Sequence, residues 1–434
     1  GGSGIVVVRY TTADFDPPIS VRGTNFVPNL FGFKLNPYLV DMRVNSITFS
    51  LTLADGVVDG DWRNVAIMED PDGSGYIEGT ERTQVGGVAT VNTSAGTITF
   101  SAPFIVPAAG MNYVMRADIA DLQSGDTFTL GLAMSNIVVV STTNTSDKAI
   151  KFNGSAAPVT HVASPEIVWD GGAGDGKWNS RFNWDPDVVP DAGSEVTIDA
   201  NAVVTAAEGE AGLNFATLTL GSAAGTYSPS LVLSTHIASG GSIEINNGAS
   251  FVYRSQENLS VGGDVEVNNG GVFRSSTTYG FAVGGDLIVR SGGLLTHNVN
   301  FSTLASYLNL DVAGNFDLQA GGLVNGDYMG YSAGGPGVGG STTYDGGGGG
   351  GYGGVGGRGG NHDNGGVAYG SAEAPADAGS KGGDCTQGAH IGGTGGGYFK
   401  LNVGGLSTLD GTITMNGGNG DDGVNANANQ AAGG

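Results

Sequence analysis

The chain has 434 residues, of which only 13% are charged, and its 41 acidic residues against 17 Lys and Arg give a formal net charge of -24. This charge opposes contact with nucleic acid, and no cluster of Lys and Arg offers a local exception. No run of 18 apolar residues is present, so we expect no transmembrane segment. The single cysteine, Cys385, cannot form an internal disulfide.

Residues 1–164 are predicted to form one all-β unit. Segments rich in Val, Ile, Thr and Ser alternate with period two and end at Gly, Asn or Asp, as half-buried strands and tight turns do. Eight or so short strands of this kind predict an immunoglobulin-like β-sandwich. The expected strands lie near Ile5 to Tyr10, Leu30 to Leu35, Ser46 to Leu53, Val65 to Met68, Thr97 to Phe100, Tyr113 to Ala117, Thr127 to Ala133 and Ile137 to Val140.

The first expected strand begins with a run, Ile5 to Val8, that is apolar on both faces. The strand from Ile5 to Tyr10 is therefore predicted either in the middle of a sheet or in the open sheet edge of a neighbouring molecule, as a donor strand. An ordinary buried strand explains the same residues, so both interpretations stay open.

A loop with calcium-binding character follows the fourth expected strand. The segment D-P-D-G-S-G-Y-I-E-G-T-E, from Asp70 to Glu81, has acidic or hydroxyl side chains at positions 1, 3 and 5, Gly at position 6 and Glu at position 12. Ca²⁺ prefers many oxygen ligands at flexible distances. The predicted ligands are Asp70, Asp72, Ser74, the Tyr76 carbonyl, Glu78 and Glu81. The alternative is a solvated acidic turn, because position 5 is Ser and no flanking helices are predicted.

Three of the four tryptophans, Trp169, Trp178 and Trp184, lie in the segment that begins near residue 165. The pattern W-D-G-G, W, N-W, V-P and V-T-I-D over about 31 residues resembles the segment that opens the β-helical part of bacterial surface proteins, autotransporter-like and filamentous-haemagglutinin-like passengers among them. The resemblance implies a solenoid at a cell surface. Indoles are large apolar plates that suit the open first coil of a solenoid, so residues 165–235 are predicted to be a Trp-rich cap and the first coils.

A 22-residue repeat follows. The segments S-G-G-S-I-E-I-N-N-G, V-G-G-D-V-E-V-N-N-G and V-G-G-D-L-I-V-R-S-G begin at residues 239, 261 and 283, and a looser copy comes 29 residues later. Each copy keeps two inward apolar positions around a mostly polar residue. The predicted inward pairs are Ile243/Ile245, Val265/Val267, Leu287/Val289, Phe316/Leu318 and, in a remote copy, Ile413/Met415. Residues 236–331 therefore predict a right-handed parallel β-helix, with the Asn pairs 246/247 and 268/269 stacked.

Glycine dominates residues 332–395. Such a stretch buries little apolar surface per residue, so it is predicted either to be a flexible loop or to be ordered by extended, polyglycine-like packing against a partner. Because an apolar segment and the remote repeat copy follow it, we expect an insertion between coils. Residues 396–434 are then a further solenoid coil and a Gly- and Asn-rich end.

No catalytic constellation is predicted. The five histidines lie far apart, have no metal-ligand spacing, and are expected at the surface or in turns. They are His161, His236, His297, His362 and His390. The G-x-S-x-G match at residues 330–334 lacks the helix that a nucleophile elbow needs, and residues 417–425 are a single, weak match to a calcium-binding nonapeptide.

These patterns predict a non-catalytic structural or adhesive protein of the extracellular cell surface, such as a filament, surface-layer or stalk component. Its expected partners are copies of itself, joined by the donor strand Ile5 to Tyr10 or by stacking of solenoid ends, and glycans or other surface components are further candidates. The alternative is a carbohydrate-active enzyme or carbohydrate-binding module on a β-helix. Tyr253, Phe273, Tyr279 and Phe281 would then form an aromatic platform, although they fit equally well as corner or core residues.

Overall fold

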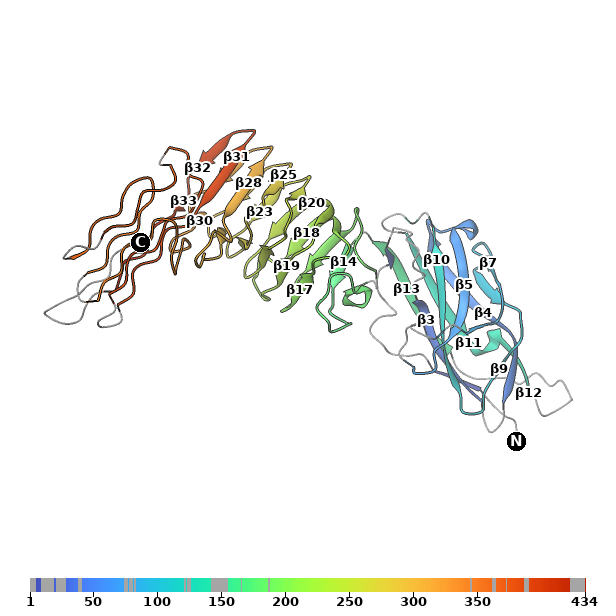
Figure 1. The fold of residues 1–434 in the computed structure, drawn as a ribbon. Helices are drawn as coiled ribbons and strands as arrows, with labels where there is room; N and C mark the ends of the chain where they lie inside the picture. Colours follow the sequence, from blue (N-terminus) through green and yellow to red (C-terminus); the bar gives the residue numbers. More distant parts are fainter. Residues whose placement is uncertain are drawn as a thin grey trace. The chain divides into compact units, whose positions relative to one another are not determined.

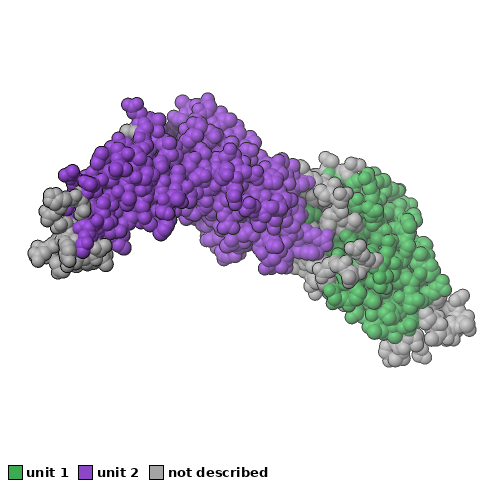
Figure 2. Space-filling view, viewed as in Figure 1, with its two compact units in different colours: residues 1–167, 184–188 green, residues 168–183, 189–434 purple. Residues whose placement is uncertain are grey.

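The chain divides into two compact units in a computed structural model (Figure 1; Figure 2). Unit 1 holds residues 1–167 and 184–188, and unit 2 holds residues 168–183 and 189–434. The residues that the structure describes are 5–8, 19–20, 29–37, 41–73, 77, 81, 83–120, 122, 126–141, 155–164, 166–185, 188–343, 346–360, 364–371, 373–385, 390–421 and 434.

Strands dominate both units, which confirms the all-β prediction. Among the described residues the helices are three short 3-10 turns, η1 (Asp59–Asp61), η2 (Met134–Asn136) and η3 (Arg181–Asn183). None of the helices in this part of the chain is long and apolar enough to cross a membrane.

Unit 1 contains two mainly antiparallel sheets. The first has the order β1-β3-β10-β5-β6, and the second has the order β2-β13-β11-β4-β8-β7, with β9 and β12 also paired to β4. The first sheet consists of β1 (Ile5–Val8), β3 (Asn29–Pro37), β10 (Met111–Ile119), β5 (Trp62–Glu69) and β6 (Gln84–Val85). The second consists of β2 (Ile19–Ser20), β13 (Ser155–Ser164), β11 (Thr127–Ala133), β4 (Met42–Asp55), β8 (Thr97–Phe100), β7 (Ala89–Asn92), β9 (Phe104–Val106) and β12 (Ile137–Ser141). All eight predicted strands are present.

The two sheets pack face to face through an aromatic core, so unit 1 is the predicted sandwich. Phe33 of β3 and Phe49 of β4, which belong to different sheets, meet edge to face with ring centroids 5.6 Å apart. Trp62 of β5 and Phe128 of β11 meet in the same way at 4.9 Å. Aromatic pairs of this geometry contribute about 0.5–1.5 kcal/mol each beyond the area that they bury.

Among the described strands, β1 comes last in its sheet and pairs antiparallel with β3 of the same chain, Ile5 opposite Pro37 and Val8 opposite Lys34. The prediction of a place in the middle of a sheet is therefore wrong. Residues 9 and 10 of the predicted donor segment lie outside the described residues.

Unit 2 is a parallel β-solenoid with three faces. The first face has the order β16-β18-β20-β23-β26-β29-β32, the second β17-β19-β21-β24-β27-β30-β33, and the third β22-β25-β28-β31. The short strands β14 (Glu166–Trp169), which begins in unit 1, and β15 (Trp184–Asp185), which belongs to unit 1, precede them in the chain. The first face comprises β16 (Glu195–Ile198), β18 (Leu213–Leu220), β20 (Ile237–Ile245), β23 (Val265–Val267), β26 (Leu287–Val289), β29 (Phe316–Leu318) and β32 (Ser407–Leu409). The second comprises β17 (Val203–Ala206), β19 (Ser230–Leu233), β21 (Ser250–Tyr253), β24 (Val272–Ser275), β27 (Leu294–His297), β30 (Leu323–Asn325) and β33 (Thr412–Thr414). The third comprises β22 (Leu259–Val261), β25 (Phe281–Val283), β28 (Leu308–Val312) and β31 (Phe399–Val403).

The coil register follows the predicted repeat. Ile243 pairs with Val265, and Val265 pairs with Leu287, so neighbouring coils are 22 residues apart. These inward side chains are at most 1% exposed, and burying an aliphatic side chain contributes roughly 1.5–3 kcal/mol. The predicted Asn stack is confirmed for the first residue of each pair, because Asn268 Nδ2 donates to Asn246 Oδ1 at 2.9 Å.

The last coil has a different register from the predicted one. Leu409 of β32 lies beside Leu318 on the first face, whereas Ile413 of β33 lies beside Val324 on the second face. The predicted inward pair Ile413/Met415 is therefore wrong. The alternation T-I-T-M imitates the inward pattern, but backbone pairing aligns the preceding S-T-L segment with the first face.

A ladder of side-chain hydrogen bonds runs along one corner of the solenoid. At four successive steps between coils, the residue just before the inward-facing part of the first-face strand accepts, through its side chain, the backbone N–H of its equivalent one coil later. The backbone N–H groups donate as follows: Asp264 to Ser242 Oγ (3.1 Å), Asp286 to Asp264 Oδ1 (2.7 Å), Asn315 to Asp286 Oδ1 (2.7 Å) and Leu406 to Asn315 Oδ1 (2.9 Å). Each rung contributes about 0.5–1.5 kcal/mol. The ladder ends at Leu406 because a leucine side chain has no acceptor.

The tryptophan segment covers the second face at the first coil. The Trp178 N–H donates to the Thr205 carbonyl at 2.9 Å, and the Thr205 N–H donates to the Gly176 carbonyl at 2.8 Å, so residues 176–178 pair with β17. The Trp178 side chain is fully buried. This placement fits the predicted role of an apolar cap.

Between β30 and β31 the chain forms a set of extended glycine-rich segments, which we call the glycine bundle (Figure 1). Its segments are residues 330–342, 346–351, 354–360, 364–370, 378–385 and 390–397. The second segment makes backbone hydrogen bonds with four others. These bonds join Gly348 to Gly340 (2.9 Å) and Gly383 (2.7 Å), and Gly349 to Gly357 (2.8 Å) and Gly366 (2.8 Å). A strand in a sheet points its backbone hydrogen-bonding groups in two opposite directions and has only two neighbours. An extended helix with three residues per turn points them in several directions, so hydrogen bonds to four neighbours indicate helices of this kind.

Short runs of x-G-G triplets occur in the glycine bundle, at residues 352–360 and 391–396. Several apolar side chains that flank its glycines are exposed, as for Val338 (44%), Val355 (74%), Val367 (64%) and Ile391 (60%), whereas Lys381 is buried. The intervening glycines pack against backbone, since a Cβ on Gly366 would lie 1.8 Å from the Gly337 carbonyl oxygen. The described part of the glycine-rich tract is thus ordered by polyglycine-like packing, in which its segments pack against one another within the chain.

Two of the histidines are buried, which corrects the prediction that all five lie at the surface or in turns. His161 is 1% exposed, and its Nε2 lies 2.9 Å from the Leu30 carbonyl oxygen. His297 is fully buried, its Nδ1 lies 2.8 Å from the Asn298 carbonyl oxygen, and its Nε2 accepts the Tyr398 N–H at 3.2 Å. Burial lowers the pKa of His297, and the bond to the Asn298 carbonyl opposes this only in part. The ring is therefore neutral and joins the solenoid to the glycine bundle.

Gly366→Ala is expected to destabilise the glycine bundle by about 1–3 kcal/mol, because the new methyl group overlaps a backbone carbonyl that has no side chain to move. Gly357→Ala is the matched control, since a Cβ there would meet nothing within 4 Å. Hydrogen exchange of the bundle amides measures both variants. Equal protection in the two variants would contradict the proposed close packing.

Acid is expected to weaken the fold through His297. Its folded-state pKa lies below the unfolded value, so the unfolded chain binds more protons and stability is lost as the pH falls below about 6.5. The measurement is thermal unfolding at pH 7 and at pH 5. It compares the natural chain with His297→Gln and with His236→Gln, which is the control because His236 is exposed. We expect only His297→Gln to show a smaller loss; the same loss in all three would exclude this histidine as the source.

Candidate metal centre and surface groove

The predicted calcium loop connects β5 to β6 in unit 1. Its base is fixed by strand pairing, with Ile67 opposite Val85 and Met68 opposite Gln84. The Asp70 N–H donates to the Asn112 carbonyl at 3.0 Å, which anchors the start of the loop to β10. Two strands therefore hold this loop, where a helix–loop–helix calcium site uses two helices.

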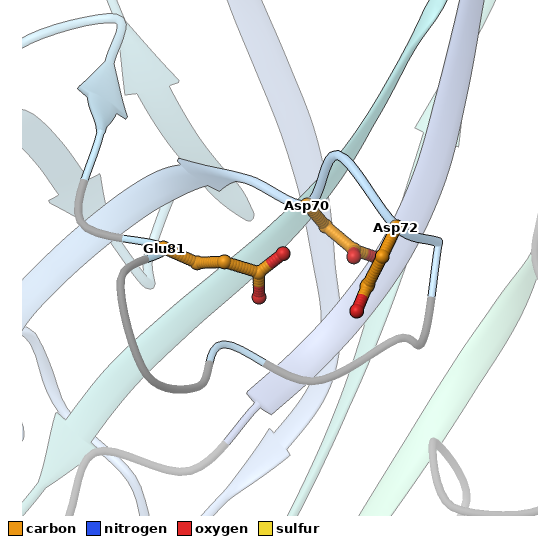
Figure 3. Close-up of side chains that lie close together, drawn as sticks. All are labelled: Asp70, Asp72 and Glu81. Atoms are coloured by element: carbon orange, nitrogen blue, oxygen red, sulfur yellow. The ribbon is translucent and has the colours of Figure 1, made fainter.

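Three predicted ligands come together in this loop (Figure 3). One carboxylate oxygen from each of Asp70, Asp72 and Glu81 lies within 4.8 Å of the other two. Asp70 is fully buried, Asp72 is exposed and Glu81 is half-buried. The other predicted ligands, Ser74, Tyr76 and Glu78, lie outside the described residues.

A tight turn holds two of these carboxylates together, and a further acidic side chain lies next to the loop. Asp70 Oδ1 accepts the Gly73 N–H at 3.0 Å, and Gly73 has a φ of 77°, so a tight turn places Asp72 next to Asp70. Burial raises the pKa of the neighbouring Glu69 carboxyl. Burial, together with the nearby Glu69 charge, also raises the pKa of Tyr113. Carboxylates this close repel one another, and a hard cation with oxygen ligands relieves that repulsion.

The predicted aromatic platform on the solenoid is wrong. Tyr253, Phe273 and Phe281 are at most 1% exposed, and only Tyr279 is open to solvent, at 43%. Phe273 and Phe281 meet edge to face at 5.2 Å inside the coils. These rings point inward because they occupy the same alternating positions as the aliphatic ladder.

A groove of about 540 Å³ lies between the glycine bundle and the last coil, in unit 2. Its lining includes Tyr352, Pro375, Asp377, Tyr398, Phe399 and Met415. None of these residues was predicted as a site. The sequence signal was the occurrence of tyrosines next to the glycine runs, but only the folded bundle shows that residues from 350 to 415 share one groove.

The fold places the chain among all-β proteins in which a β-sandwich precedes a parallel β-solenoid. No family model matches the chain, and no curated protein matches it. One chain of a dockerin–cohesin complex crystallised at pH 5.5 is similar to 31% of this chain and 88% of its own length, with 16% identity and a TM-score of 0.14. A TM-score of this size carries no argument about fold or function.

Calcium is expected to raise the unfolding temperature of the natural chain and to do so much less for Asp70→Asn and Glu81→Gln. At a concentration of 100 times the Kd, one bound ion adds about 2.7 kcal/mol of stability. Asp55→Asn is the control, because it removes an exposed charge from the same unit outside the loop. Calorimetry with calcium and with chelator measures all four chains. An unchanged unfolding temperature for the natural chain would exclude the site.

Proposed function

We propose that the protein is a non-catalytic component of an extracellular cell surface, that it has a structural or adhesive role, and that it associates with copies of itself. The observation that carries this proposal is the exposure of apolar side chains on the last coil among the described residues, formed by β31, β32 and β33. A parallel β-solenoid is compatible with such a role because its stacked coils supply length and repetitive surface. The acidic, glycine-rich and lysine-poor composition supports the extracellular location.

The last coil exposes apolar side chains at positions that the inner coils bury. Leu409 and Ile413 are 56% and 44% exposed, while their partners in the preceding coil, Leu318 and Val324, are fully buried. Leu406, at the end of the corner ladder, is 70% exposed. Exposed apolar side chains at the end of a stacked core favour a further layer of protein.

The backbone of the last coil favours the same contact. Strands β31, β32 and β33 each come last in their sheet, so each presents an edge that no described strand covers. Unpaired strand edges are templates for pairing with another chain. The proposed occupant of these edges is the last coil of a second copy.

The first coil differs, which sets the direction of the proposed contact. Residues 176–178 already pair with β17, and the buried Trp178 covers that end. Head-to-tail stacking of solenoids is therefore disfavoured, and a twofold contact between two last coils is favoured. A filament needs a second interface, for which the edge strand β1 is the candidate.

The double variant Leu409→Asp with Ile413→Asp is expected to abolish self-association, because it places charge in the proposed contact. Val203→Asp is the control, since Val203 is 61% exposed on an outward position of the first coil. Sedimentation velocity over a concentration series, with negative-stain electron microscopy with calcium and with chelator, measures assembly. We expect the control to assemble like the natural chain and the double variant to stay monomeric.

Two outcomes would contradict the proposal. A natural chain that stays monomeric at every concentration, with calcium and with chelator, removes self-association. A double variant that assembles as well as the control places the contact somewhere other than the last coil.

A further inference from the structure

The groove between the glycine bundle and the last coil has a lining of aromatic rings, one carboxylate and bare backbone. Tyr352, Tyr398 and Phe399 are the aromatic residues of the lining, Asp377 is its carboxylate, and glycines form much of the remainder. The Tyr398 ring is only 8% exposed and packs against Tyr307, with ring centroids 4.7 Å apart. The volume of about 540 Å³ lies in the range of small-ligand sites, roughly 300–1,000 Å³. This site is independent of the self-association proposed above.

In the described part of the chain, the only charged side chain that lines the groove is a carboxylate, Asp377. Among the described residues, the lining holds no Lys, Arg, His, Asn, Gln or Trp. The Ser380 hydroxyl already donates to the Tyr369 oxygen at 3.0 Å and accepts the Gly337 N–H at 2.9 Å. The groove therefore lacks the cationic side chains with which proteins commonly bind anions.

The carboxylate is held in a fixed position. Asp377 Oδ1 accepts the Tyr331 hydroxyl at 2.7 Å and the Ala378 N–H at 2.8 Å. Its other oxygen, Oδ2, makes no hydrogen bond with the described residues. The nearest lysine along the chain, Lys381, is buried and forms an ion pair with Asp384, so it does not neutralise Asp377. One carboxylate oxygen is thus available to a ligand.

The ring of Tyr352 is also held in place by the bundle. The Ala376 N–H donates to its hydroxyl at 3.1 Å, and the Tyr369 ring meets it edge to face at 5.0 Å. A Cβ on Gly370 would lie 2.7 Å from the Tyr352 ring, so only glycine allows this approach. A preorganised ring loses little conformational entropy when a ligand binds.

We propose that this groove binds an alkylammonium cation. A fixed carboxylate beside aromatic rings attracts a cation by charge and by cation–π interaction, which contributes about 0.5–2 kcal/mol per ring. The net charge of -24 raises the local concentration of cations and disfavours anions. A quaternary or primary ammonium group on an alkyl chain matches this mixture of charge, rings and apolar side chains.

Calorimetric titration of the full chain at low salt tests the proposal. Choline and tetramethylammonium represent free cations, and Nα-acetyl-lysine amide, which keeps its ε-ammonium group, represents a protein side chain. Comparing their affinities shows whether the groove prefers a free cation or a lysine side chain. The neutral isostere of choline, 3,3-dimethylbutan-1-ol, is expected to bind at least about tenfold more weakly, which corresponds to about 1.4 kcal/mol. Equal binding of choline and this alcohol would overturn the proposal.

Three variants locate the site. Asp377→Asn and Tyr352→Leu are each expected to weaken choline binding about tenfold, because they remove the carboxylate charge and one ring. Glu195→Gln removes the same charge from an exposed position on the first coil and is expected to leave the affinity within about twofold. Thermal unfolding of each variant shows whether the bundle stays folded. If Asp377→Asn does not fold, Tyr352→Leu still tests the site, because it removes one ring and keeps the carboxylate.

Two results would refute the assignment. One is an affinity of Asp377→Asn and Tyr352→Leu equal to that of Glu195→Gln, which would show that only the overall charge attracts the cation. The other is the absence of binding by all three cations up to about 10 mM, since even one ring and one carboxylate together should hold a cation at that concentration.

Discussion

The backbone hydrogen bond between neighbouring extended segments is the interaction on which both parts of unit 2 depend. In the solenoid it joins each strand to its equivalent in the coils before and after, so the stack grows along one axis. In the glycine bundle it joins one segment to four others, so the packing extends in several directions. The change from one pattern to the other coincides with the loss of side chains, because backbones that lack a Cβ can approach from more than two sides.

Much of the fold was predictable because alternation and spacing record it directly. The inward pairs beginning at Ile243 and the 22-residue spacing predicted both the coils and their register. The last coil was misread because the long insertion removes the spacing, and T-I-T-M satisfies the alternation as well as S-T-L does. The burial of His161 and His297 was missed because a polar side chain in a core depends on partners such as the Leu30 carbonyl, which lies 131 residues from His161.

The candidate sites also differ in how far a local sequence pattern encodes them. The calcium loop is a local feature, so its sequence alone brought Asp70, Asp72 and Glu81 into one hypothesis, and the strand pairing at its base explains their proximity. The groove is assembled from the ends of several bundle segments and the last coil, and no local pattern encodes it. The aromatic platform failed for the opposite reason: it was inferred from residue type at positions where the period of two already assigned the rings to the interior.

The close backbone packing of the glycine bundle also has an evolutionary consequence. Glycines such as Gly366 are fixed by backbone contact, since a Cβ there would lie 1.8 Å from the Gly337 carbonyl oxygen, while side chains at positions such as Val355 face solvent. Substitutions at these outward positions leave the backbone packing of the glycine bundle intact. A protein built in this way can therefore diversify a set of displayed side chains at little cost in stability, much as antibody loops vary on a constant framework.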